Sequence, residues 1–351
     1  SSHNLQPMKG FTFKNPYANN TYTFEGRFNS GEVSIRLNRA GWHLIGNPYP
    51  SALDWGASLN PDGWNGEGSL RSTIWYRIGG SGGSSGGGSF ATYNKDGAIG
   101  VNDGQRYIPP MQSAWVYAES PGTLTVNDSA QSLTNVGLYK QSTDHPGVRL
   151  QVEQQGRSDE IAVYFPAGSG SHFEGYDSEK RFASSEAYPQ LYTSSSGHVK
   201  LAINALGSLA EETQVPVGFE TQTGGEFTLT GRAFNLDTNK YTVYLEDKAK
   251  DAMVPLEKMP YTFTSEIRSG EDRFTLHILK NATSIAGVEG ENVTIFGWKE
   301  RARIQLQGTH HARVRIYDVT GHLVKQAQMQ GTQKSFRIPQ TGIYLIQVQT
   351  N

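Results

Sequence analysis

The chain has 351 residues, which is enough for two or three domains. Its net charge of −2 shows no basic excess for nucleic acid or an anionic membrane surface, and no apolar run is long enough for a transmembrane helix. The absence of cysteine excludes disulfides and cysteine-ligated metals, while 40 glycines and 36% apolar residues favour short strands and many turns.

The first residues predict a β-hairpin. Residues 11–28 contain two strand patterns, and the Asn-Ser-Gly sequence at 29–31 is a turn signal. In the next strand, Val33, Ile35 and Leu37 alternate with polar residues, so we expect one buried face.

Aromatic residues are concentrated in the first 120 residues. Trp55 and Trp64 lie in WGASLNPDGWNGEG, a stretch with no strand pattern, where an indole either packs into the core or contacts a ligand. Because β modules bind sugars on exposed rings, these two residues are the candidate ligand-binding residues. Trp42, Trp75 and Trp115 lie in strand patterns, and we predict that they are core residues.

Two short segments place oxygen-bearing side chains before a glycine. These are Asn94 with Asp96, and Asn102 with Asp103. The spacing is similar to the start of a calcium loop, but the distal glutamate of an EF-hand is missing. Asn, Asp and Gly also build turns by themselves, so both interpretations stay open. We predict no other metal site and no cofactor.

Residues 79–89 read GGSGGSSGGGS and lie between two strand patterns, which predicts a mobile hairpin loop. A flexible lid over a ligand is the alternative, and no other residue supports it. A polar, turn-rich stretch at 127–145 then predicts a connection between domains.

The middle of the chain predicts a second β domain. Strand patterns recur every 10–20 residues, with Gly, Asn, Asp and Pro between them, which is typical of a sandwich or jelly roll. We expect Val243 and Leu245 to be buried against Phe227 and Leu229. The predicted fold class is all-β, with tandem β-sandwich (jelly-roll or Ig-like) domains and a small C-terminal Ig-like β-sandwich. The predicted domains cover residues 1–130, 146–281 and 288–351.

No catalytic motif stands out. There is no nucleophile elbow and no zinc-protease motif, and His310 and His311 would face opposite sides of a strand. A glycosidase needs two facing carboxylates, for which the sequence offers five candidates without a pairing. They are Asp159, Glu160, Asp177, Glu246 and Asp247. Glu246 and Asp247 end a strand, where a solvated turn or pairing with a basic neighbour such as Lys248 is the simpler interpretation. We therefore predict no catalytic residue.

The C-terminal residues predict a small β-sandwich. Period-2 strands surround the turn signal Thr320-Gly321, and a last strand follows a proline and a glycine. The alternation predicts a core made of Ile316, Val319, Leu323, Tyr344 and Ile346.

The amino-acid sequence of this region resembles that of a known family. VRIYDVTGHLV followed by GIYLIQV resembles the C-terminal sorting domain (type A) of cargo proteins of the Bacteroidetes type IX secretion system. The resemblance implies export across the outer membrane, a secreted or cell-surface location, and the type IX secretion machinery as a partner. The family pattern ends with a further lysine-rich strand, which is missing before Asn351. The chain also begins without a signal peptide, so we expect it to be a mature or trimmed form.

A second resemblance covers roughly residues 10–120. The segments GWHLIGNPYPSALDW, STIWYR, ATYN and YIPPMQSAWVYA resemble a non-catalytic β region of large Bacteroidetes surface proteins with the same sorting domain. Asp128-Ser129-Ala130 also matches the short O-glycosylation acceptor pattern of these bacteria, with Ser129 as the acceptor. We therefore expect a secreted or surface-anchored structural or adhesive protein that contacts a glycan or another surface protein. The alternatives are a carbohydrate-binding or accessory region of a larger polysaccharide-degrading enzyme, or an enzyme outright.

Overall fold

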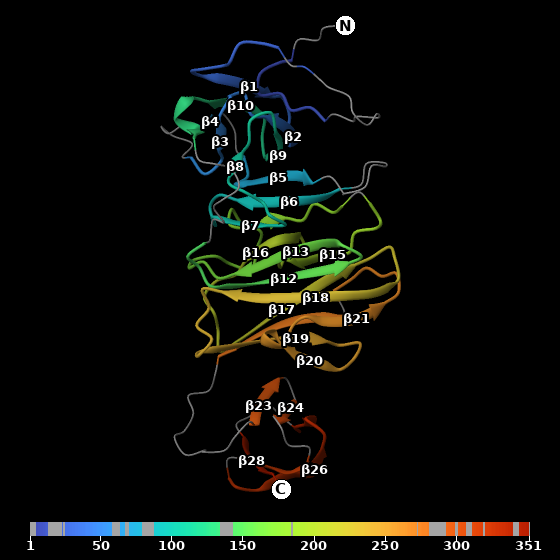
Figure 1. Ribbon diagram of the computed structural model, residues 1–351. Coiled ribbons are helices and arrows are strands. Elements are labelled where there is room, and N and C mark those ends of the chain that lie inside the picture. Colours follow the sequence, from blue (N-terminus) through green and yellow to red (C-terminus); the bar gives the residue numbers. More distant parts are fainter. Residues whose placement is uncertain are drawn as a thin grey trace. The chain divides into compact units, whose positions relative to one another are not determined.

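The computed structural model shows an all-β protein that divides into two compact units, Ser1–Asn281 (unit 1) and Ala282–Asn351 (unit 2) (Figure 1). The structure describes residues 5–12, 23, 25–57, 64–66 (backbone only), 70–78, 88–133, 143–183, 185–271, 273–280, 293–298, 301–306, 311–318, 320–339 and 344–350. In these ranges the only helices are the 3-10 turns η1 (Asp128–Ala130) and η2 (Leu256–Lys258). None of the helices described there has the length and apolar character that crossing a membrane would require.

Three antiparallel sheets build the first part of unit 1. The five-stranded sheet has the order β2 (Gly41–Gly46), β9 (Ser113–Ala118), β5 (Thr73–Ile78), β6 (Ser89–Asn94) and β7 (Ile99–Val101). The three-stranded sheets are β1 (Val33–Leu37), β10 (Gly122–Val126) and β4 (Trp64–Gly66), and β11 (Gln131–Ser132), β3 (Ala52–Asp54) and β8 (Tyr107–Ile108). They enclose one apolar core, in which Leu53, Ile74 and Tyr93 are among the largest fully buried side chains.

The predicted strand at Val33–Leu37 is present as β1, with Ser34 and Arg36 exposed on its outer side. Its partner differs from the predicted hairpin, because β1 pairs with β10, which follows about 85 residues later in the chain. Residues 23 and 25–28 of the expected partner form no strand, and the rest of that segment lies outside the described residues, apart from 11–12, which also form no strand.

One eleven-stranded sheet builds the second part of unit 1. Its order is β20 (Ala252–Pro255), β19 (Tyr241–Asp247), β22 (Phe274–Lys280), β17 (Glu212–Glu220), β15 (Gln190–Ser194), β16 (Lys200–Ala205), β13 (Arg157–Tyr164), β12 (Gly147–Gln154), β18 (Gly225–Phe234) and β21 (Tyr261–Ser265), and β14 (Ser178–Glu179) also pairs with β16. The β13–β16 pair is parallel, and the other pairs are antiparallel.

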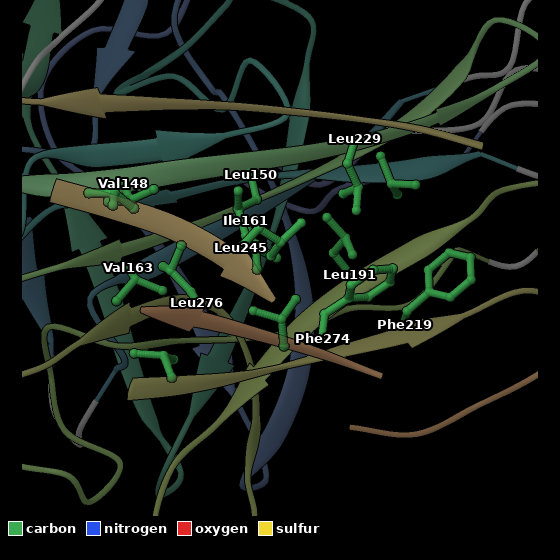
Figure 2. Packing of buried hydrophobic residues seen from close by; sticks show 14 of the residues in the cluster. Val148, Leu150, Ile161, Val163, Leu191, Phe219, Leu229, Leu245, Phe274 and Leu276 are labelled. Atoms are coloured by element: carbon green, nitrogen blue, oxygen red, sulfur yellow. The ribbon is translucent and has the colours of Figure 1, made fainter. Parts of the chain in front are cut away.

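This sheet encloses its own core. Strands near opposite ends of the sheet order, β19 and β21, contribute to one buried cluster, so the sheet must turn back on itself as a sandwich. Val243 and Leu245 of β19 share the cluster with Phe227 and Leu229 of β18, as predicted, although these strands are not neighbours in the sheet. Figure 2 shows Leu150, Ile161, Leu245 and Leu276 gathered in this interior, with Leu229 in the same cluster.

The two predicted N-terminal domains lie in one compact unit. Ile99 and Val101 of β7 pack in a cluster with Tyr164 of β13 and Ile203 of β16, and Figure 1 shows β7 beside these strands. The predicted boundary between residues 130 and 146 therefore lies inside unit 1. The polar, turn-rich composition of residues 127–145 predicts a connecting segment. It cannot show that the sheets on either side of this segment share apolar contacts.

Unit 2 consists of two three-stranded antiparallel sheets. They are β23 (Val293–Trp298), β24 (Arg301–Leu306) and β27 (Gln333–Arg337), and β26 (Leu323–Gln330), β25 (His311–Asp318) and β28 (Tyr344–Thr350). Their core includes Ile304, Val314 and Ile316, with Tyr344 and Ile346 packed against it.

The predicted turn at Thr320-Gly321 joins β25 and β26, and Gly321 adopts a φ of +83° there. Leu323 is not a core residue, because its exposed fraction is 51%. A bulge between Ile316 and Tyr317 pairs Leu323 with Tyr317, which turns Leu323 to the outer face of the sheet. Val319 lies outside the described residues.

Candidate ligand-binding face

One face of the five-stranded sheet in unit 1 is rich in aromatic side chains. In β9, Ala114, Val116 and Ala118 are buried in the core, so Trp115 and Tyr117 point to the opposite face and are half-buried. The register places Tyr117 opposite Trp42 of β2, and Trp115 opposite Trp75 of β5. Residues far apart in the chain therefore form one aromatic face.

The rings of this face support one another. The centroid of Trp42 lies 4.7 Å from that of Trp75 and 5.2 Å from that of Tyr117, both edge-to-face. Trp75 is fully buried, and its indole nitrogen donates a hydrogen bond of 3.0 Å to the carbonyl of Glu179 in β14. Trp75 thus anchors the face, while Trp42, Trp115 and Tyr117 stay half-buried.

Arg181 lies against the aromatic face. Its guanidinium carbon is 4.0 Å from the ring centroid of Trp42, 5.1 Å from that of Phe90 and 5.7 Å from that of Trp115. Burial lowers the pKa of Arg181, and the charge of Glu179 opposes that shift. No described residue forms a hydrogen bond or an ion pair with its guanidinium.

Arg71 lies beside the same face but is neutralised. Its guanidinium carbon is 3.8 Å from the ring centroid of Tyr117. Its nitrogens pair with the carboxylates of Glu119 at 2.6 Å and Glu179 at 2.5 Å. Trp42 and Tyr117 are thus each covered by an arginine, whereas Trp115 has its nearest guanidinium carbon at 5.7 Å. Of these three half-buried rings, Trp115 lies farthest from a guanidinium.

The predicted ligand-binding tryptophans do not form this face. Trp55 is buried, with an exposed fraction of 3%, and its indole nitrogen donates to the carbonyl of Ser72 at 2.8 Å. Trp55 is therefore a core residue. The backbone of Trp64 lies in β4, and its side chain lies outside the described residues.

Trp42 and Trp115 show why the prediction missed the face. Both were expected in the core because they alternate within strands, but alternation assigns residues to two faces without saying which face is covered. The signal that could have identified the face is that β9 carries small apolar residues on one side and aromatic residues on the other.

The calcium candidates make structural hydrogen bonds. The amide nitrogen of Asn94 donates to the carbonyls of Gly175 at 2.9 Å and Asp177 at 3.0 Å. The carboxylate of Asp96 accepts from the hydroxyl of Ser72. Among the described side chains, no three of His, Cys, Asp or Glu come together as a metal site.

Asn102 binds the second part of unit 1. Its side-chain oxygen accepts from the backbone N–H of Glu160 at 2.7 Å, and its amide donates to the carboxylate of Asp159 at 2.9 Å. Asp103 is exposed beside it. The pair Asn94 and Asn102 therefore joins the two parts of unit 1, and turn formation is the interpretation that fits both segments.

Each of the five candidate carboxylates binds its own partner, and the first three are paired with basic side chains. Asp159 pairs with Lys180, and Glu160 lies 3.4 Å from Arg149. Asp247 forms a bidentate pair with Arg273, at 2.9 and 3.1 Å, in place of the suggested Lys248.

The remaining two carboxylates also have their own partners. Glu246 lies 3.0 Å from the imidazole of His277. Asp177 accepts backbone N–H groups from Ala205 and Glu174, and burial raises its pKa to about 6. Ser129, the glycosylation candidate, is exposed in η1 and donates its hydroxyl to Asn127 at 2.7 Å.

A family model described as a domain of unknown function (DUF8693) matches residues 1–278. The match ends inside β22, close to the end of unit 1, and it includes the whole aromatic face and Arg181. No curated protein and no solved structure matches the chain.

Proposed function

We propose that this chain, which belongs to the DUF8693 family, is a non-catalytic adhesive protein of a Bacteroidetes cell surface that binds glycans on its aromatic face. The observation that carries the proposal is the position of Trp115. This indole is half-buried on a sheet face, next to a guanidinium without a described hydrogen-bond partner.

The physical chemistry of sugars fits these groups. The apolar face of a sugar ring packs on an aromatic ring, and its hydroxyl groups need hydrogen-bond donors and acceptors at the edge. Trp115 supplies the ring and Arg181 supplies the donors. Arg181 lies over Trp42, Trp42 packs edge-to-face on Trp75, and Trp75 lies opposite Trp115 in the sheet. These contacts hold the two groups in place before a ligand arrives, which reduces the entropy cost of binding.

The export part of the proposal rests on the resemblance of residues 314–348 to a type A sorting domain. The described residues of the buried cluster in unit 2 all belong to unit 2. A core of its own supports a role in which unit 2 acts as the address and unit 1 as the adhesive part.

The binding part is tested by Trp115→Ala. The full chain is screened on an array of bacterial and host glycans, and hits are measured by calorimetry. We expect Trp115→Ala to weaken binding at least about tenfold, because truncating a central aromatic anchor of a binding site typically costs about 2 kcal/mol or more.

Phe28→Ala is the matched control, because Phe28 is an aromatic residue with an exposed fraction of 84% outside the face. It should leave binding unchanged, and thermal melting should show both variants folded. If no glycan binds the chain, or if Trp115→Ala binds as well as the parent, the proposal is wrong.

A further inference from the structure

The two arginines of the aromatic face differ, because Arg71 is bound directly by carboxylates and Arg181 is not. Four other buried or half-buried arginines of unit 1 each have a carboxylate within 3.4 Å: Arg71, Arg106, Arg149 and Arg273. Arg181 has aromatic rings against its guanidinium and no carboxylate at ion-pair distance among the described residues, and Glu179 acts on it only through its charge. A partly desolvated cation without a directly bound carboxylate favours an anionic ligand.

The position of Arg181 is set by its neighbour. Lys180 is buried and pairs with Asp159, and its backbone N–H donates to the carbonyl of Lys200 at 2.8 Å. The side chain of the next residue, Arg181, lies over the ring of Trp42. The buried ion pair therefore holds the chain from which the guanidinium projects.

The guanidinium also has close aromatic neighbours. Its carbon lies 4.0 Å from the ring centroid of Trp42 and 5.1 Å from that of Phe90, and cation–π attraction opposes its movement into solvent. The N–H groups at its edge remain free for a planar acceptor. Two parallel hydrogen bonds from one guanidinium match the two oxygens of a carboxylate.

We infer that the aromatic face recognises acidic polysaccharides, with a uronate carboxylate held by Arg181 while a sugar ring packs on Trp115. This inference rests on the proposed function and names the ligand class of the same face. Arg181 is the specificity-determining residue, because it distinguishes a uronate from the neutral sugar of the same shape.

The test compares an oligogalacturonate with its methyl ester, which keeps the sugar rings and removes the charge. Calorimetry on the full chain should show the free acid binding about tenfold more tightly than the ester, with an advantage that declines as sodium chloride is added. Arg181→Gln should abolish the advantage, and Arg181→Lys should restore only part of it, because lysine keeps the charge without the fork. Arg36→Gln, on the exposed side of β1, is the control and should keep it.

Equal binding of the acid and the ester, or an unchanged advantage in a folded Arg181→Gln variant, would overturn the inference. Tighter binding of a sulfated galactan than of the uronate, or of an acidic peptide than of either, would also overturn it. If the acid and the ester bind equally and Trp115→Ala abolishes binding of the ester, the inference fails but the proposed function stands. The two failures are thereby distinguishable.

Discussion

At the residue scale, single polar side chains join the two parts of unit 1. Asn102 stands in left-handed backbone at φ 53°, a conformation that asparagine adopts more readily than most residues. From there it reaches both Asp159 and Glu160. The features that made it resemble a calcium ligand, a short side chain with an oxygen in a turn, are the same features that this bridging role uses.

Asp177 provides a prediction about pH. Its pKa rises from 3.8 to about 6 in the folded chain, mainly because burial disfavours the carboxylate. The folded state therefore binds more protons than the unfolded state between these values, so its stability should increase as pH falls through this window. Between pH 7 and pH 5 this group should add about 1 kcal/mol to the free energy of unfolding.

The measurement is urea unfolding of the parent and of Asp177→Asn at both pH values. The asparagine cannot titrate, so the variant should lack this increment, although it should be less stable overall because its amide donor faces a backbone N–H. The same change between pH 7 and pH 5 in both proteins would show that Asp177 does not titrate there.

At the scale of secondary structure elements, a single bulge decides which residues form the core of unit 2. Before the bulge, Val314 lies opposite Ala327 and both face the core. After it, Leu323 lies opposite Tyr317 on the outer face. The apolar residues Ile316, Val319 and Leu323 were predicted to share one face without interruption. Alternation in the sequence does not show where a β-bulge inserts an extra residue into one strand.

Ile316 and Leu323 form a matched pair for mutation. Ile316 has an exposed fraction of 1% and Leu323 of 51%. Ile316→Ala should destabilise unit 2 by about 2–5 kcal/mol, whereas Leu323→Ala should change its stability by no more than about 0.5 kcal/mol.

Hydrogen exchange on the full chain can locate the effect. Faster exchange is expected in β25 and its partners for Ile316→Ala, with β12 to β22 unchanged, because the core clusters of the two units share no residues. Equal effects of the two substitutions would contradict the assigned register.

At the scale of the whole molecule, the proposal assigns glycan binding to unit 1 and export to unit 2. The family match covers residues 1–278 and the sorting-domain resemblance covers the last residues, so the two regions coincide closely with unit 1 and unit 2. We therefore expect export and binding to be separable in experiments.

The export proposal is tested by fusion. Unit 2 joined to a carrier protein should bring the carrier to the surface of a bacterium that has the type IX machinery. The Ile316→Ala fusion should stay in the periplasm if the folded shape is the address, and the Leu323→Ala fusion should be displayed like the intact one. Equal surface display of the Ile316→Ala and intact fusions would remove the support for a folded address.

The all-β class, the strand at Val33–Leu37 and the turn at Gly321 followed from the sequence alone. Strand alternation and turn chemistry depend on residues next to one another, so a linear sequence contains them. The packing of Val243 and Leu245 against Phe227 and Leu229 also followed, because one apolar face of each strand needs an apolar partner.

Tertiary structure decided which strands pair over long distances, that the two parts of unit 1 share an apolar cluster beside their own cores, and which aromatic residues remain partly exposed. Trp55 and Trp115 illustrate the reason. Both are tryptophans in the same region, but one is buried by residues of other strands and the other faces Arg181 from a segment more than 60 residues away. Burial is a property of all the segments that meet at a position, and those segments are brought together only by the fold.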